Sequence, residues 1–219
     1  RTLTEGAELA VELAGGDRTR VPNANRIARD EARLAVERAK LTDSQRYVRA
    51  LYSGGTLCDE AMLLLSTRVG PIASNIPLQP EWALAANETF RGHTALDLGA
   101  DEFTRGRPHP MIDPTICLQY LTQAAADPKT AVILLDIVLG FCAHPHPAAL
   151  FAPAISQARA RAAEAGRVLP IIITLCGTEG DPQRLSLQRT TLEAAGALVY
   201  ESNVAAALAA ASLVRQEHS

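Results

Sequence analysis

Aromatic residues are scarce in this chain: Phe, Trp and Tyr together make up 4% of its 219 residues. Ala, Leu and Val are abundant instead, and apolar residues reach 47%, so the sequence predicts a globular fold with an aliphatic core. The chain also lacks a block of basic residues, and its formal net charge is −3. We therefore do not expect nucleic acid as a partner.

Two further absences narrow the class of protein. The four cysteines are spread without a C-x-x-C pair, which argues against both a zinc ribbon and a disulfide framework. No apolar run reaches the roughly 18 residues that a membrane span requires, so no membrane partner is expected. Because no signal peptide is visible either, we expect reduced thiols and a cytoplasmic protein.

The hydrophobic pattern divides the chain into two parts. Residues 1–44 contain two stretches with helical periodicity, 3–14 and about 23–40, which we interpret as a helical arm packed on one side against an upstream domain. Residues 45–219 alternate apolar strands with helices. The stretch 70–91 interrupts this alternation, because it is rich in proline and irregular.

Five apolar stretches in the second part predict strands, and helical patterns follow each of them. The expected strands are 47–52, 94–98, 131–138, 170–175 and 197–200. Strands that alternate with helices predict an α/β fold, here a flavodoxin-like open parallel sheet with helices on both faces. Ligands of such sheets bind where the strands end at their carboxyl side.

The turn after the first expected strand reads Ser53-Gly54-Gly55-Thr56 and opens a helix. Two glycines leave the backbone uncovered, and the first N–H groups of a helix have no partner within it. The turn therefore suits a phosphate or a carboxylate. The alternative is a tight strand-to-helix turn with Thr56 as the N-cap.

The loop 101–114 follows the second expected strand and carries Arg105, Arg107 and His109 among three prolines. A guanidinium group can hold a carboxylate or phosphate through two hydrogen bonds, so the loop suits an anionic substrate. The alternative is a surface loop whose arginines pair with Asp101 and Glu102.

Three other features could carry chemistry. Asp136 interrupts an apolar strand, where a carboxylate is costly unless something pairs with it; it either orients a loop or catalytic group or is a satisfied structural carboxylate. Gly177 and Thr178 precede a helix and predict a second phosphate-facing turn. Cysteine and histidines in 140–147 match no standard zinc spacing, so we predict substrate contacts or a plain loop there and no metal.

Three segments together, 52–61, 101–114 and 134–140, resemble the FdrA family, whose members are similar to the succinyl-CoA synthetase α-subunit and to NDP-forming acyl-CoA synthetases. The resemblance covers essentially the whole chain. It implies a CoA-ligase-like flavodoxin-fold domain over residues 45–219. In the ligases, the turn that matches Ser53, Gly55 and Thr56 begins a helix that points at phosphate on a catalytic histidine.

One departure from the ligases concerns that histidine. The ligases carry it in a Gly-His-Ala-Gly segment after the strand that matches 171–175, whereas the segment 177–181 has no histidine. The partner glutamate is absent as well, and Asp136 lies close to its position. The resemblance therefore implies that the phosphohistidine is lost. FdrA-type proteins are linked to anaerobic allantoin degradation, as part of an oxamate carbamoyltransferase that uses carbamoyl phosphate.

These features predict a subunit that transfers an acyl or carbamoyl group. A phosphorylated substrate would bind at 53–56, Arg105 and Arg107 would hold an anionic partner, and His109 and Asp136 are the candidate catalytic residues. CoA or a nucleotide is the candidate cofactor, and we expect a homo- or hetero-oligomer. No CoA-binding domain is visible, so we expect the C-terminal part of a longer protein or a reduced member. The alternative is a catalytically silent ligand-binding or assembly subunit.

Overall fold

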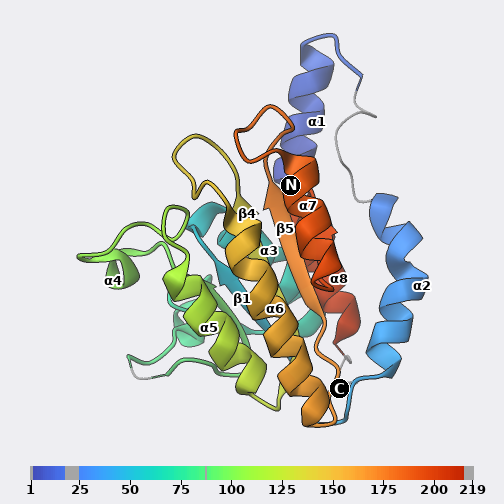
Figure 1. The fold of residues 1–219 in the computed structure, drawn as a ribbon, viewed down its shortest axis with the longest axis vertical. Helices are drawn as coiled ribbons and strands as arrows, with labels where there is room; N and C mark the ends of the chain where they lie inside the picture. Colours follow the sequence, from blue (N-terminus) through green and yellow to red (C-terminus); the bar gives the residue numbers. More distant parts are fainter. Residues whose placement is uncertain (1, 18–24, 87, 215–219) are drawn as a thin grey trace.

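The computed structural model describes residues 2–17, 25–86 and 88–214, and shows an α/β fold (Figure 1). Its strands are β1 (Tyr47–Tyr52), β2 (Ile72–Ser74), β3 (His93–Asp97), β4 (Thr130–Val138), β5 (Ile171–Cys176) and β6 (Leu198–Tyr200). Its α-helices are α1 (Leu3–Leu13), α2 (Asn25–Ala39), α3 (Gly55–Val69), α4 (Asp101–Thr104), α5 (Thr115–Ala126), α6 (Pro147–Glu164), α7 (Leu185–Ala194) and α8 (Asn203–Leu213).

The strands form one parallel sheet in the order β2-β3-β1-β4-β5-β6. This confirms the predicted open parallel sheet and adds a strand to the five that the sequence indicated. The extra strand, β2, falls in the stretch 70–91 that we expected to be irregular. It is only three residues long and pairs with β3 at the sheet edge. A strand this short is too brief for its hydrophobic periodicity to be recognised in the sequence.

Both faces of the sheet are buried, which explains why β4 is apolar almost throughout. Ile133, Leu135 and Ile137 belong to one hydrophobic core, whereas Val132 and Leu134 belong to the other. This alternation follows from the period of two in a strand. It means that a polar residue in β4 must find a partner within the protein.

Helices cover the two faces in separate layers. In Figure 1, α5 and α6 lie side by side in front of the sheet with α7 beside them, and α3 and α8 lie on the opposite face. Helix α8 has buried residues on nearly all its sides, because α2 packs on its outer surface through residues that include the buried Leu34. The second half of the predicted arm therefore packs on this domain itself.

Helix α1 touches the domain mainly through its first turn. Its N-cap is Thr2, which forms a capping box with Glu5. The N–H of Leu3 donates to Oε1 of the buried Glu60 over 2.6 Å, which places a carboxylate at the positive end of the helix. Within the described part of the chain, no helix is long and apolar enough to cross a membrane.

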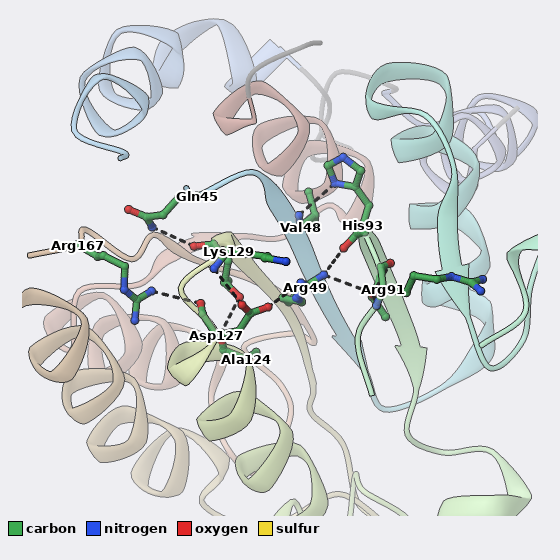
Figure 2. Close-up of polar contacts among 12 residues, drawn as sticks. Gln45, Val48, Arg49, Arg91, His93, Ala124, Asp127, Lys129 and Arg167 are labelled. Atoms are coloured by element: carbon green, nitrogen blue, oxygen red, sulfur yellow. Dashed lines mark hydrogen bonds and ion pairs between the residues drawn. The ribbon is translucent and has the colours of Figure 1, made fainter. Parts of the chain in front are cut away.

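A group of polar side chains lies near the amino ends of the strands (Figure 2), and we call it the amino-edge cluster. Its centre is Arg49 of β1, which is 2% exposed and forms an ion pair with Asp127 at 2.7 Å. The Arg49 guanidinium also lies 4.8 Å from the ring centre of Phe90 and donates to Thr94. Arg167 donates to backbone carbonyls at the end of α5, including that of Asp127. The cluster therefore ties β1 to the end of α5.

Candidate functional site

The strand order reverses beside β1, and this fixes where a ligand site is expected. The chain leaves β1 for β2 and β3 on one side and then crosses to β4 on the other side. The connections run over opposite faces, so a crevice opens between the carboxyl ends of β1 and β4. Ser53 follows β1, and Asp136 lies near the end of β4.

Two hydrogen bonds join Ser53 and Asp136 across this crevice. The Ser53 N–H donates to Oδ1 of Asp136 and the Ser53 hydroxyl to Oδ2, both over 2.7 Å. Ser53 is 6% exposed and Asp136 5%. Asp136 therefore fixes the turn before α3, which supports the orienting role that was one of its two interpretations.

The charge of Asp136 is only partly compensated. Burial raises its pKa to about 6, the two bonds from Ser53 oppose this rise, and the nearby carboxylate of Asp97 adds to it. Among the described residues, no basic side chain forms an ion pair with Asp136. A buried carboxylate without a counter-charge is a feature of functional sites more often than of plain cores.

The N-terminus of α3 carries no side-chain cap. Gly54 is the N-cap residue with extended backbone angles (φ −168°, ψ 154°), and no side chain accepts a hydrogen bond there. The alternative interpretation of Thr56 as the N-cap is therefore wrong. The N–H groups of the first turn keep their bonding capacity, and the helix dipole directs its positive end to the same place. This is the geometry of an anion site.

Two glycines bring Asp97 and His109 next to this turn. A Cβ on Gly99 would lie 2.3 Å from the Ser53 carbonyl oxygen, 2.8 Å from Nε2 of His109 and 3.2 Å from Oδ1 of Asp97. Only glycine fits between these groups. A Cβ on Gly55 would lie 3.2 Å from Oδ2 of Asp97. His109 from the loop after α4 therefore reaches the carboxyl end of β1.

Asp97 was not singled out from the sequence, although it belongs to the same group. Burial raises its pKa, and the Gly99 N–H and the charge of His109 work against this rise. The signal that identified Asp136, a carboxylate near the end of an apolar strand, also applies to Asp97. Reading the end of β3 with the same rule would have found it.

Arg105 and Arg107 lie on the same loop but do not join this group. Both are exposed, and neither forms an ion pair or a side-chain hydrogen bond within the described residues. The alternative interpretation, in which they pair with Asp101 and Glu102, does not hold in this structure. Their guanidinium groups remain available to a ligand that approaches the carboxyl edge of the sheet.

A pocket opens on the other side of Ser53, and we call it the switch pocket. It is small, with a cavity volume of about 20 Å³, and it is partly open to solvent. Its walls come from the turn after β1, from β4, from the loops before α5 and α6, and from these two helices: Ser53, Pro110, Met111, Pro114, Cys117, Asp136, Ile137, Val138, His144, Pro147 and Phe151. The His144 N–H donates to the Met111 carbonyl over 2.7 Å and holds the two loops together.

The second predicted phosphate turn has a different arrangement. Asp181 accepts hydrogen bonds from the Thr178 N–H over 2.5 Å and from its hydroxyl over 3.1 Å. Helix α7 begins only at Leu185, several residues after this turn. Gly177 packs against Leu139, which would lie 2.7 Å from a Cβ at that position. A phosphate site at Gly177 and Thr178 stays a prediction. In this structure the carboxylate of Asp181 already accepts the hydrogen bonds that Thr178 would donate to a phosphate.

Among the described residues, the cysteines and the remaining histidines form no further centre. Within the described residues, no group of three His, Cys, Asp or Glu side chains could hold a metal ion. His144 accepts the N–H of His146, and Cys142 is exposed. Burial raises the pKa of Cys58, so this thiol at the start of α3 stays protonated and packs as a small apolar residue.

Comparison with known proteins gives a family and a relative for this chain. The sequence pattern of the CoA-ligase family matches residues 51–213, which run from the end of β1 to the end of α8. The chain is also 38% identical to the uncharacterized protein YahF of Escherichia coli K12 over 214 residues. That match covers 98% of this chain and 41% of YahF, so the chain spans less than half of its relative.

Proposed function

This chain belongs to the CoA-ligase family, and from that premise we propose that it acts as an acyl-CoA synthetase-like subunit that binds a phosphorylated substrate at residues 53–56. The observation that carries the proposal is the uncapped N-terminus of α3. Its donors are fixed in place because Asp136 holds Ser53 by two hydrogen bonds. A preorganised row of N–H groups binds the phosphate of an acyl phosphate without first having to reorganise.

The loop after α4 supplies the second half of the proposed site. Arg105 and Arg107 are exposed and have no partner within the described residues, so they are free to hold an anionic partner of the phosphate. His109 lies beside Ser53 and Asp97 and is the candidate for proton transfer. Its Nδ1 accepts the Met111 N–H over 3.3 Å, so the neutral ring carries its proton on Nε2, which faces the turn.

The absence of a histidine from the segment 177–181 narrows the reactions that the site could carry out. No histidine lies between His146 and His218, so α3 has no phosphohistidine to stabilise in the segment 177–181. We therefore propose direct transfer from an acyl phosphate rather than through a phosphorylated enzyme. Carbamoyl phosphate with oxamate as acceptor is the specific pair that the resemblance to the FdrA family suggests. CoA is the other acceptor to test.

Replacing Gly55 tests the phosphate site directly. Gly55→Asp places a carboxylate at the first turn of α3, beside Asp97, and should abolish binding of inorganic phosphate and carbamoyl phosphate in calorimetry. Gly6→Asp in α1 is the matched control, because nothing lies within 4 Å of a Cβ there. Equal binding by the Gly55 variant and the control would move the phosphate site elsewhere.

A silent assembly subunit is the second candidate function. It is favoured by the absence of a histidine from 177–181. Carbamoyl transfer to oxamate, and acyl-CoA formation from acetyl phosphate, would be measured for the chain alone and with neighbouring gene products. Phosphate binding without either activity would favour the silent subunit. Acid-labile phosphate on any histidine would instead favour the ligase cycle.

A further inference from the structure

A groove with a cavity volume of about 240 Å³ opens between α5 and α6, which lie side by side in Figure 1. It lies over the C-terminal halves of the two helices, and we call it the α5–α6 groove. None of the described residues that line it belongs to the turn 53–56 or to the loop 101–114. An apolar cavity of about 150 Å³ can hold a benzene molecule, so this groove has room for a somewhat larger organic ligand.

The floor of the groove consists of alanine methyl groups. Ala125 of α5 is 7% exposed and Ala158 of α6 is 4% exposed, and Ala154 lines the groove one helical turn before Ala158. Where two helices meet, larger side chains usually interdigitate and fill the space between them. Alanine leaves that space open here. An alkyl chain that lies on this floor would leave water, which favours binding.

Both charged side chains that line the groove are arginines. The guanidinium group of Arg167 is half-buried and fixed, because it donates to the carbonyl of Ala125 over 2.9 Å and to that of Asp127 over 3.4 Å. These bonds use only part of its donors. Arg161 is exposed and forms no ion pair or side-chain hydrogen bond within the described residues. The groove therefore has guanidinium donors that are available to a ligand.

The negative groups that adjoin the groove leave it positive. Asp127 follows the end of α5, but its carboxylate is paired with Arg49 at 2.7 Å. Glu164 lies one helical turn after Arg161 and forms no ion pair in the described part of the chain. The C-terminal ends of α5 and α6 contribute roughly half a negative charge each, against a full positive charge on each arginine. Lys129 adds a further positive charge beside Asp127.

We propose that the α5–α6 groove binds an aliphatic monocarboxylate of about six carbons. Its alkyl chain would lie on the alanine floor, and its carboxylate would accept hydrogen bonds from Arg161 and Arg167. The apolar floor favours such a ligand over a bare inorganic anion, and the arginines favour it over a neutral or cationic one. The proposal goes beyond the phosphate site at residues 53–56 and does not rest on it, because different residues line the two sites.

Sodium hexanoate is the probe, titrated into the whole chain near neutral pH at constant ionic strength. Binding is followed by the amide resonances of Ala125 and Ala158, and we expect these to shift saturably. Hexan-1-ol keeps the alkyl chain without the charge and should bind at least about tenfold more weakly, the loss expected for one charge-assisted hydrogen bond. Butanoate is two methylenes shorter and should also bind about tenfold more weakly. Equal binding of hexan-1-ol or of butanoate would overturn the proposal.

Two variants test the groove from different sides. Arg161→Gln removes one charge and should weaken hexanoate about tenfold. Arg68→Gln is its matched control, because Arg68 is likewise exposed in the last turn of a helix, α3, on the opposite face of the sheet. Ala154→Leu fills part of the groove and should weaken hexanoate as much. Ala160→Leu, at an exposed position of α6 outside the groove, is the control for it. Both controls should leave binding within about twofold.

Phosphate binding should survive Arg161→Gln, so failure of the groove can be distinguished from failure of the phosphate site. Unchanged hexanoate binding in either groove variant, or equal loss in Arg161→Gln and Arg68→Gln, would refute the carboxylate groove. If the resonances of Ala125 and Ala158 shift when the protein alone is concentrated, the groove is instead an interface between copies of this chain, and the proposal is wrong.

Discussion

Two buried charges lie in neighbouring strands at opposite ends of the sheet, and their surroundings differ. Arg49 of β1 forms an ion pair with the carboxylate of Asp127 in the amino-edge cluster (Figure 2). Its guanidinium group also lies against the ring of Phe90. Asp136 of β4 has only the neutral donors of Ser53. The first charge is neutralised within the chain, whereas the second adjoins a pocket.

This difference separates a structural charge from the charge that we propose to be functional. Removing one partner of a buried ion pair costs much stability, because the other charge is left in a poor environment. A buried charge without a counter-ion already carries that cost, so removing it costs little or even stabilises the fold. Such a cost persists in a protein when a ligand or a reaction uses the charge.

The largest effect is expected for Asp127→Asn. It leaves the Arg49 guanidinium buried without a counter-ion and should lower the free energy of unfolding by about 3–5 kcal/mol, measured by urea denaturation. Glu164→Gln, an exposed carboxylate at the end of α6, should change it by less than about 0.5 kcal/mol. Phosphate binding should be unaffected in whatever fraction stays folded. If Asp127→Asn lowered the free energy of unfolding only slightly, the proposed difference between the amino and carboxyl edges of the sheet would be wrong.

Asp136→Asn should have the opposite effect on stability to Asp127→Asn: it should raise the free energy of unfolding near neutral pH, and the gain should depend on pH. Because the folded-state pKa of Asp136 is about 6, above its unfolded value of 3.8, the ionised group destabilises the fold above pH 6, and this penalty disappears as pH falls toward 4. The free energy of unfolding of the variant relative to wild type should therefore rise by about 3 kcal/mol between pH 4 and pH 7.5. A difference that is flat with pH would show that Asp136 is not buried as a charge.

For Asp127, burial alone would raise the pKa, but the hydrogen bond and charge of Arg49 and the Lys129 N–H together lower it. Its stabilising effect is therefore present above the unfolded pKa and is lost as pH falls through the folded one. The penalty of Asp127→Asn should shrink below pH 4, where the advantage of Asp136→Asn also disappears. Measuring both variants over one pH range tests both halves of the comparison.

Ser53→Ala should have a moderate effect. It removes one of the two donors that stabilise the ionised form of Asp136, so the pKa of this carboxyl should rise above about 6. The lost bond to a charged group should cost about 2 kcal/mol of unfolding free energy. Carbon-13 NMR of the Asp carboxyl groups would report the titration. Ser66→Ala, which loses only a bond to a carbonyl of its own helix, should leave the Asp136 midpoint unchanged.

The sequence predicted much of this architecture because the strands are apolar and regularly spaced. The bounds of β1 were predicted without error, and those of β4 and β5 to within one residue at each end. The rule for carboxyl ends of parallel strands also placed Ser53 and Asp136 at the same edge. Short β2 was missed, because three residues in a proline-rich stretch owe their strand geometry to pairing with β3.

The details of the site depend on contacts that no local pattern encodes. The convergence of Asp97 and His109 on Gly99 requires the path of the loop over residues 105–109, which is set by packing between distant segments. The switch pocket likewise requires two loops joined by the bond from His144 to Met111. Sequence spacing placed the individual residues near the site but could not place them against each other.

Arg107→Lys should have the smallest effect on stability, and its value lies in separating binding from folding. Arg107 is exposed and forms no ion pair within the described residues, so the melting temperature should stay within about 2 °C of wild type. Lysine keeps the charge but loses the planar fork that binds an anion through two hydrogen bonds, so carbamoyl phosphate should bind about tenfold more weakly in calorimetry. Arg68→Lys at the exposed end of α3 is the control and should change neither quantity. If Arg107→Lys lowers the melting temperature while leaving binding unchanged, the loop is structural.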